Sequence, residues 1–212
     1  MTSPGPRIDW NYEGKPDELM GTGATRSEKT IAYTSGLLVP LVLVVLGITG
    51  AVQWVWWQWI VALAISADIS AGVVANSLNS CKRFYHSPVK PGEEKYRSIK
   101  NPILFSALHV YPLIIWLVFD RSNWMFALVW YSLLVLSTWI IGKIPLYLRR
   151  PTSIVIIASV ILVNFYFLLP IPGFEWLAPL LFIKIIAGHA VREEPYRPEL
   201  SGQEQFVGLS VL

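Results

Sequence analysis

Cysteine and charged residues are scarce in this chain of 212 residues. Cys81 is the single cysteine, which excludes an internal disulfide and any metal or redox site built on two cysteines. Charged residues make up 15% of the chain, whereas hydrophobic residues make up 54% and the mean hydropathy is +0.49. Because so few polar groups cannot cover a water-soluble core, the composition predicts a multi-pass membrane protein.

Several motifs of known chemistry are also missing. The first thirty residues hold no short apolar core with a small-residue cleavage site, so we expect no removable signal peptide. There is no HExxH or HxxxH pair, no glycine-rich phosphate loop, no nucleophile elbow and no TVGYG filter. The absence of an internal repeat weakens the case for an inverted-repeat transporter. The net charge of +3 is typical of basic cytoplasmic loops, so we expect no nucleic-acid partner.

The hydrophobic residues fall into six stretches, most of them near the ~20 residues that a helix needs to cross the hydrocarbon core. We therefore expect an all-α, polytopic bundle of six transmembrane helices, the last being the shortest. A polar N-terminal arm (1–29) precedes this domain (30–191), and a polar tail (192–212) follows it. The predicted spans are residues 31–53, 57–79, 102–119, 125–147, 152–170 and 174–191.

Basic residues are distributed unevenly between the two sides of such a bundle. If the N-terminus is cytoplasmic, fourteen of the 17 lysines and arginines lie in the arm, the long 82–100 loop, the RRP turn or the tail, and the opposite side has only Arg121. The positive-inside rule then predicts that both termini are cytoplasmic. Four tryptophans fall at the opposite boundary, where indole rings commonly lie: Trp54, Trp57, Trp124 and Trp176.

The second predicted span carries unusual polar residues in the stretch ADISAGVVANSLNSCKRFYH. On one continuous helix they form a stripe within an arc of roughly 80°. Asp68 then lies near the bilayer midplane, where an acid costs around 2.5 to 3.5 kcal/mol, so we expect the stripe to face the bundle interior or a water-filled cavity. The alternative is structural, with the amides bonding neighbouring helices and Asp68 paired with Lys143 or Lys184. The stripe comprises Asp68, Gly72, Asn76, Asn79, Arg83 and His86.

The stretch DISAGVVAN resembles the opening of the CDP-alcohol phosphotransferase motif. Asp68, Gly72 and Ala75 occupy matching positions. Ala71 stands where the family has its second acid, Asn76 stands where it has an arginine, and no later pair of aspartates follows. Without those carboxylates the two-metal cage of the family cannot form, so the resemblance does not carry the family's chemistry to this chain.

The three histidines, His86, His109 and His189, all fall in the cytoplasmic half of the predicted topology. An imidazole can transfer protons near neutral pH, and neutral imidazoles can bind a metal ion such as Zn²⁺. We favour acid/base catalysis as the role of His109. A metal ion bound by the three histidines is the alternative, as a cofactor. An interior histidine beside the kink at Pro112 is the structural interpretation.

The leading hypothesis is an integral-membrane enzyme that acts on a lipid or isoprenoid-like substrate in a cytoplasm-facing pocket. Asp68 and His109 would be its acid/base pair. The alternatives are a proton-coupled transporter of small solutes, with Asp68 carrying the proton, and a membrane subunit that forms a homo-oligomer or joins a larger complex. The expected partners are membrane lipid and a hydrophobic small molecule. The substrate-binding candidates are Asn76, Asn79, Lys143, Lys184, Tyr111 and Arg83.

Overall fold

A computed structural model describes residues 7–168 and 170–197 of the chain. The ends of the predicted arm and tail (1–6 and 198–212) and residue 169 of the fifth predicted span lie outside the described residues. The elements, in chain order, are β1 (Arg7–Ile8), α1 (Arg26–Ser35), α2 (Leu38–Ile48), α3 (Trp56–Ala75), α4 (Asn79–His86), η1 (Glu94–Tyr96), α5 (Pro102–Leu108), α6 (Tyr111–Phe119), α7 (Trp124–Lys143), α8 (Leu146–Tyr166), α9 (Leu177–Phe182), the π-helical η2 (Ile183–Ala190) and β2 (Tyr196–Arg197).

The described chain is mostly helical, and it contains five helices that are long and apolar enough to cross a membrane. This agrees with the prediction of an all-α, multi-pass membrane bundle. Two of the five are interrupted, because α1 and α2 together make the first and α5 and α6 make the third. The last predicted span is a shorter apolar helix, Leu177–Ala190, formed by α9 and η2. The five longer helices are Arg26–Ile48, Trp56–Ala75, Pro102–Phe119, Trp124–Lys143 and Leu146–Tyr166.

Two prolines account for polar contacts between neighbouring helices. Pro40 lies in the first turn of α2 and has no N–H, so the carbonyl of Gly36, four residues earlier, gains no helical hydrogen bond from it. The hydroxyl of Ser70 on α3, whose shorter bond goes to the Ser66 carbonyl at 2.5 Å, lies 3.4 Å from the Gly36 carbonyl. In the same way, Pro179 in α9 leaves the carbonyl of Glu175 without a helical donor, and the Asn164 amide on α8 donates to it at 2.9 Å. A proline in one helix therefore creates an attachment point for a polar side chain of its neighbour.

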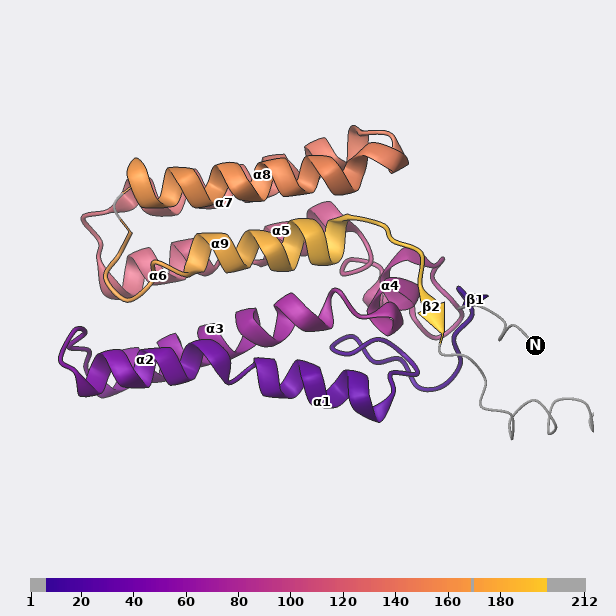
Figure 1. Ribbon diagram of the computed structural model, residues 1–212, viewed down its shortest axis with the longest axis horizontal. Coiled ribbons are helices and arrows are strands. Elements are labelled where there is room, and N and C mark those ends of the chain that lie inside the picture. The colour runs from indigo at the N-terminus through magenta and orange to yellow at the C-terminus, as the bar shows by residue number, and fades with distance from the viewer. Residues whose placement is uncertain (1–6, 169, 198–212) are drawn as a thin grey trace, which may run out of the picture.

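The last apolar helix lies in the middle of the bundle, between the layer that contains α8 and the layer that contains α2 and α3 (Figure 1). It packs against α3, α7 and α8. Most of its side chains are buried, whereas few side chains of the candidate span Leu146–Tyr166 are buried. Burial inside protein, rather than contact with lipid, accounts for the apolar sequence of this short helix.

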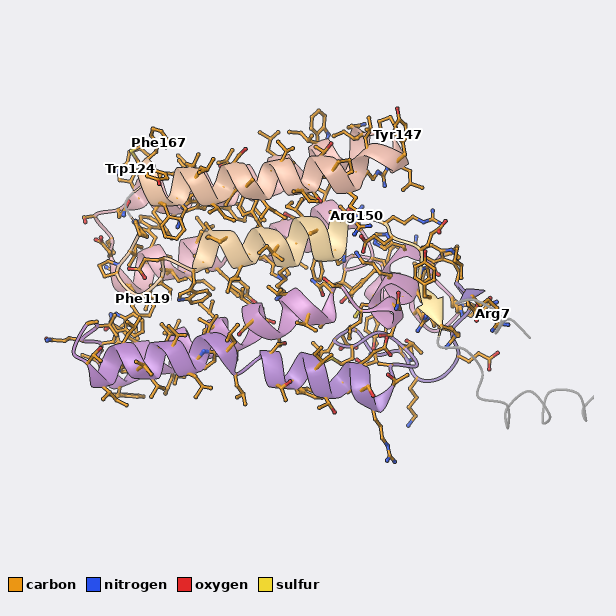
Figure 2. All side chains as sticks on the ribbon, in the orientation of Figure 1. Arg7, Phe119, Trp124, Tyr147, Arg150 and Phe167 are labelled. Carbon is orange, nitrogen blue, oxygen red and sulfur yellow. The ribbon has the colours of Figure 1, made fainter. Side chains whose placement is uncertain are left out.

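The two ends of the bundle differ in character. Phe119, Trp124 and Phe167 mark one end, and Arg7 and Arg150 lie toward the other (Figure 2). At the basic end β1 pairs antiparallel with β2, with Arg7 opposite Arg197. The segments near both chain ends therefore lie on the same side of the bundle, beside α4 (Figure 1).

The prediction of one continuous polar helix through the second span is wrong. α3 ends at Ala75, Leu78 has the extended dihedral angles φ −66° and ψ 145°, and α4 begins at Asn79. The physical reason combines a tertiary contact with a local one, because the Asn76 side chain bonds to another helix and the Ser77 side chain bonds back to α3. The Asn76 amide bonds to η2 and the Ser77 hydroxyl returns to the carbonyl of Val73 at 2.9 Å. The stripe is thus split between two helices with different axes.

Candidate functional site

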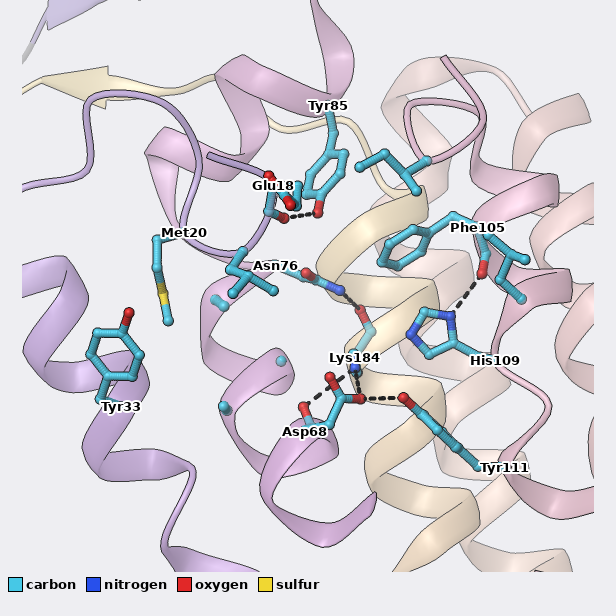
Figure 3. Close-up of a pocket in the computed structure, with 16 residues that line it drawn as sticks. Glu18, Met20, Tyr33, Asp68, Asn76, Tyr85, Phe105, His109, Tyr111 and Lys184 are labelled. Carbon is cyan, nitrogen blue, oxygen red and sulfur yellow. Dashed lines mark hydrogen bonds and ion pairs between the residues drawn. The ribbon is translucent and has the colours of Figure 1, made fainter. Parts of the chain in front are cut away.

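A cavity of about 470 Å³ lies among α1, α3, α5 and η2 (Figure 3). Residues 18–20 of the N-terminal arm and Tyr85 of α4 cover the end of the cavity nearest the basic side of the bundle. Its walls are mainly apolar, and its polar groups gather on α3, η2 and the α5–α6 junction. The polar side chains that the following paragraphs use are Asp68, Asn76, His109, Tyr111 and Lys184.

An ion pair between Asp68 and Lys184 forms the polar centre of this cavity (Figure 3). The Lys184 ammonium group donates to the Asp68 carboxylate and, at 3.3 Å, to the Asp68 backbone carbonyl. The Tyr111 hydroxyl donates to the same carboxylate oxygen at 2.6 Å. The Lys184 side chain is 4% exposed and the Asp68 side chain is 44% exposed, so the acid faces the open cavity while the base is enclosed. Of the two partners that the sequence suggested for Asp68, the structure selects Lys184.

Gly72 makes this ion pair geometrically possible. It lies one helical turn after Asp68 on α3, and the Lys184 side chain crosses the helix at that point. A Cβ atom on Gly72 would lie 2.3 Å from Lys184 Cε and 2.8 Å from Nζ. Any larger residue would therefore occupy the path that the lysine takes from η2 to the carboxylate.

His109 occupies the break between α5 and α6. Pro112 cannot donate to the carbonyl of Leu108, four residues earlier, and the Val110 N–H donates to that carbonyl at 3.0 Å instead. The backbone N–H of His109 donates to Ser106, so the Phe105 carbonyl is free to accept from His109 Nδ1 at 2.7 Å. A carbonyl only accepts, so Nδ1 carries the proton and Nε2 of the neutral ring has a lone pair. Figure 3 shows this second nitrogen directed toward Lys184 and the cavity.

Asn76 attaches α3 to the π-helical segment η2. Its amide Nδ2 donates to the Lys184 carbonyl at 3.1 Å, and its side chain is buried. Gly188 on η2 lies against Asn76, since a Cβ there would lie 2.9 Å from Asn76 Cβ. π-Helical turns are rare and often occur at functional sites. Here the wide turn lies directly behind Lys184, and Asn76 holds its backbone in place.

The cavity opens on the side of the bundle rather than at its end. Tyr33 on α1 is 60% exposed and Leu108 on α5 is 61% exposed, and both residues line the cavity. α1 packs against α3, whereas α5 packs against α7 and η2, so a gap remains between α1 and α5. Asp68 lies about 10 Å from the end of α3 at Ala75, taking 1.5 Å per residue. The opening is therefore at the depth of the lipid chains when these helices span a bilayer.

The remaining substrate-binding candidates lie outside this cavity. The Asn79 side-chain oxygen accepts from the Tyr196 N–H at 3.1 Å, and Arg83 donates to the Tyr196 carbonyl at 3.4 Å. Both residues thus hold the strand β2 against α4. Lys143 lies at the end of α7, with its ammonium group 5.9 Å from the Trp139 ring. The cavity thus brings together Asp68, Asn76, His109, Tyr111 and Lys184, and leaves Asn79, Arg83 and Lys143 elsewhere.

The three histidines do not form a metal site in the part of the chain that the structure describes, where no group of three or more metal-ligating side chains is found. The Phe105 ring contacts two of them, stacking on His189 at 3.8 Å and meeting His109 at 4.6 Å between ring centroids. His189 Nε2 lies 3.0 Å from the Ile99 carbonyl and acts as a donor there. Burial, with the nearby charge of Lys82, lowers the pKa of His86 to about 3, so this ring is neutral at physiological pH.

Sequence reasoning missed several residues of the cavity. Tyr85 and Phe105 gave no polar periodicity, and Tyr33 resembles any aromatic residue near a membrane boundary. Residues 18–20 lie in the polar arm outside the predicted spans, yet Met20 is buried and its carbonyl accepts from the Ser80 hydroxyl at 2.6 Å. Only the close packing of the arm on α4 makes it part of the site.

Comparisons of the chain with protein-family models, with curated proteins and with solved structures find no match in any of the three.

Proposed function

We propose that this chain is an integral-membrane enzyme that carries out acid/base chemistry on a lipid-like or isoprenoid-like substrate in the lateral cavity. One observation carries the proposal: a cavity of about 470 Å³ opens between α1 and α5 and holds an ion pair beside an imidazole with a free nitrogen. Charged groups are costly at this depth, and intramembrane ionisable residues commonly belong to functional sites. A hydrophobic molecule dissolved in the bilayer has direct access to such an opening.

The division between apolar and polar walls supports an amphipathic substrate. Ala71, Ala75 and Leu108 provide apolar surface, and the polar groups gather around Asp68 and Lys184. Pockets of this size that are mostly apolar, with a few convergent polar groups, are typical of small-molecule sites. The hydrocarbon part of the substrate would contact the apolar walls, and its oxygen would reach Lys184.

His109 is the proposed general base. Its Nδ1–H is fixed by the Phe105 carbonyl, so Nε2 is free to accept a proton from a substrate hydroxyl group. Lys184 donates two of its three N–H bonds to Asp68, and the third is free to stabilise the negative charge that develops on the substrate oxygen. Asp68 and Tyr111 hold the ammonium group in position for this role.

Comparison of cellular lipids tests the proposal. Lipids extracted from cells that overexpress the chain are analysed by mass spectrometry beside those from cells that produce His109→Asn. Asparagine retains a donor for the Phe105 carbonyl but has no basic nitrogen. We expect a lipid species to be formed or consumed by the unmodified chain and to be unaffected by His109→Asn, while Leu162→Ala on the exposed face of α8 behaves as the unmodified chain.

Two outcomes contradict the enzyme proposal. One is a lipid profile that is identical for the unmodified chain and for His109→Asn at equal amounts of folded protein. The other is dissipation of a pH gradient by proteoliposomes that contain the unmodified chain, with loss of that activity in Asp68→Asn. The second outcome would assign Asp68 to proton transfer and the chain to the transporters.

A further inference from the structure

A second cavity, of about 630 Å³, lies at the basic end of the bundle, between the end of α4, the loop that follows it and the start of α5. Its lining includes Arg97, Lys100 and Arg192, and no acidic residue of the described chain lines it. Pro102, the first residue of a candidate membrane span, also lines it. The cavity therefore lies where a helix enters the bilayer, at the level of lipid headgroups.

Two acids near this cavity, Glu93 and Glu193, are paired with bases. Glu93 pairs with Lys100 at 2.7 Å. Glu193 lies 3.8 Å from Lys82 and 3.6 Å from Arg150. Neither Arg97 nor Arg192 has an acidic partner in the described residues; the Arg192 guanidinium group lies 4.5 Å from the Trp10 ring, a contact that leaves its N–H edge free. Two guanidinium groups beside one cavity are thus without a negative charge.

The surroundings of His86 provide independent support for a positive field in this cavity. His86 lines it, and its buried Nε2 has no hydrogen-bond partner in the described chain. The charged neighbours that lower its pKa are all cations, namely Lys82, Arg192 and Arg149. A bound anion would oppose this accumulation of positive charge.

We propose that this cavity binds the phosphate group of an anionic lipid, and that this lipid is the substrate of the lateral cavity. Guanidinium groups bind phosphate through paired, charge-assisted hydrogen bonds, so Arg97 and Arg192 are the principal ligands. The substrate assignment rests on the enzyme function proposed above, whereas the anion site stands without it.

The position of α5 links the two cavities. Leu104 and Leu108 are 49% and 61% exposed, and their spacing of four residues puts them on one face of the helix. This face runs from Asn101 at the phosphate cavity to Leu108 at the lateral opening, a distance of about 10 Å along the helix. Tyr85 lines both cavities. A lipid with its phosphate in this cavity can therefore lay a chain along α5 to the lateral opening.

Native mass spectrometry of the full chain in a neutral detergent tests the site. The probes are dioleoylphosphatidic acid, dioleoylphosphatidylcholine and inorganic phosphate. We expect one phosphatidic acid molecule per chain, with affinity at least about tenfold weaker in Arg97→Gln/Arg192→Gln, because two charge-assisted hydrogen-bonding groups are lost. The matched control is Arg7→Gln/Arg26→Gln, which removes the same charge from the same end of the bundle and should retain the affinity.

The remaining outcomes distinguish a lipid phosphate from free phosphate. They also distinguish failure of the phosphate site from failure of the proposed enzyme function. Competition by inorganic phosphate at the affinity of phosphatidic acid would support the anion site and overturn its assignment to a lipid. Equal affinity of the two double variants, or equal binding of phosphatidylcholine, would overturn the site itself. His109→Asn should keep phosphatidic acid binding, so failure of the enzyme proposal and failure of the phosphate site give different results.

Discussion

Lys184 reaches Asp68 by crossing α3 over Gly72, where a Cβ atom would lie 2.3 Å from the lysine Cε. Lys184 and Gly72 thus depend on each other although they are far apart in the chain, because the Lys184 side chain occupies the space that a side chain at position 72 would fill. This relationship, rather than the ion pair alone, sets the geometry of the cavity.

Gly72→Ala should shift the end of the Lys184 side chain away from Asp68 and lower the free energy of unfolding by about 1 to 2 kcal/mol, because the ion pair is weakened while the Asp68 carboxylate keeps its contact with the open cavity. Thermal unfolding in detergent measures the effect. Gly142→Ala on α7 is the matched control, since nothing lies within 4 Å of a Cβ there. Alanine is a better helix former than glycine, so the control should be unchanged or slightly more stable. Equal stability of both variants would mean that the lysine has another path.

Removing one member of the Asp68–Lys184 pair should destabilise the bundle more than removing both. Lys184→Met leaves the carboxylate without its cation and should cost about 1 to 3 kcal/mol, since Asp68 is partly exposed and keeps the Tyr111 hydroxyl, whereas the double variant with Asp68→Leu should recover most of that loss. A double-mutant cycle on unfolding free energies in detergent measures the coupling. Additive effects of the two substitutions would show that the pair contributes nothing to folding and is retained for another reason.

Stability should depend on His86 below pH 6.5. Burial and nearby cations lower its folded-state pKa to about 3, while the unfolded chain keeps a value of 6.5. Between these values the unfolded state binds more protons, so this contribution to stability is complete above pH 6.5 and is lost as the pH falls toward 3, by ~1.4 kcal/mol per pH unit. Between pH 7 and pH 4.5 the free energy of unfolding should therefore fall more steeply with decreasing pH for the unmodified chain than for His86→Phe. Equal slopes would show that the folded-state pKa of His86 is not lowered.

Gly21 fixes the N-terminal arm against α4 and so closes one end of the cavity. It has φ +73°, and a Cβ atom would lie 2.1 Å from the carbonyl carbon of Ser80. Gly92 has φ +85° but has open space around it, so Gly92→Ala is a control that introduces backbone strain without a clash. Both alanine variants should lose about 1 to 2 kcal/mol from backbone strain, and Gly21→Ala should lose more through the clash. Limited proteolysis should cut the arm faster only in Gly21→Ala; equal cleavage of both variants would show that the packing at Ser80 is unimportant.

The sequence predicted several residues of the cavity because polar and charged side chains are costly within a membrane span. An acid, an amide and a lysine within apolar stretches require an explanation, and the structure brings Asp68, Asn76 and Lys184 together. Asn79 and Arg83 could not be separated from them by periodicity, because the end of α3 at Ala75 depends on a hydrogen bond to η2 that a linear pattern does not contain.

Composition and hydropathy alone determined that this is a helical chain with several helices able to cross a membrane, because a chain this poor in charge must place its apolar surface in lipid or in protein. Only the tertiary structure decided which polar groups meet. Lys184 and Asp68 are joined because Gly72 leaves room for the lysine, and His109 presents Nε2 because its Nδ1–H donates to the Phe105 carbonyl, which the break between α5 and α6 leaves free. Such contacts join elements far apart in the chain, and their geometry follows from packing rather than from the period of a helix.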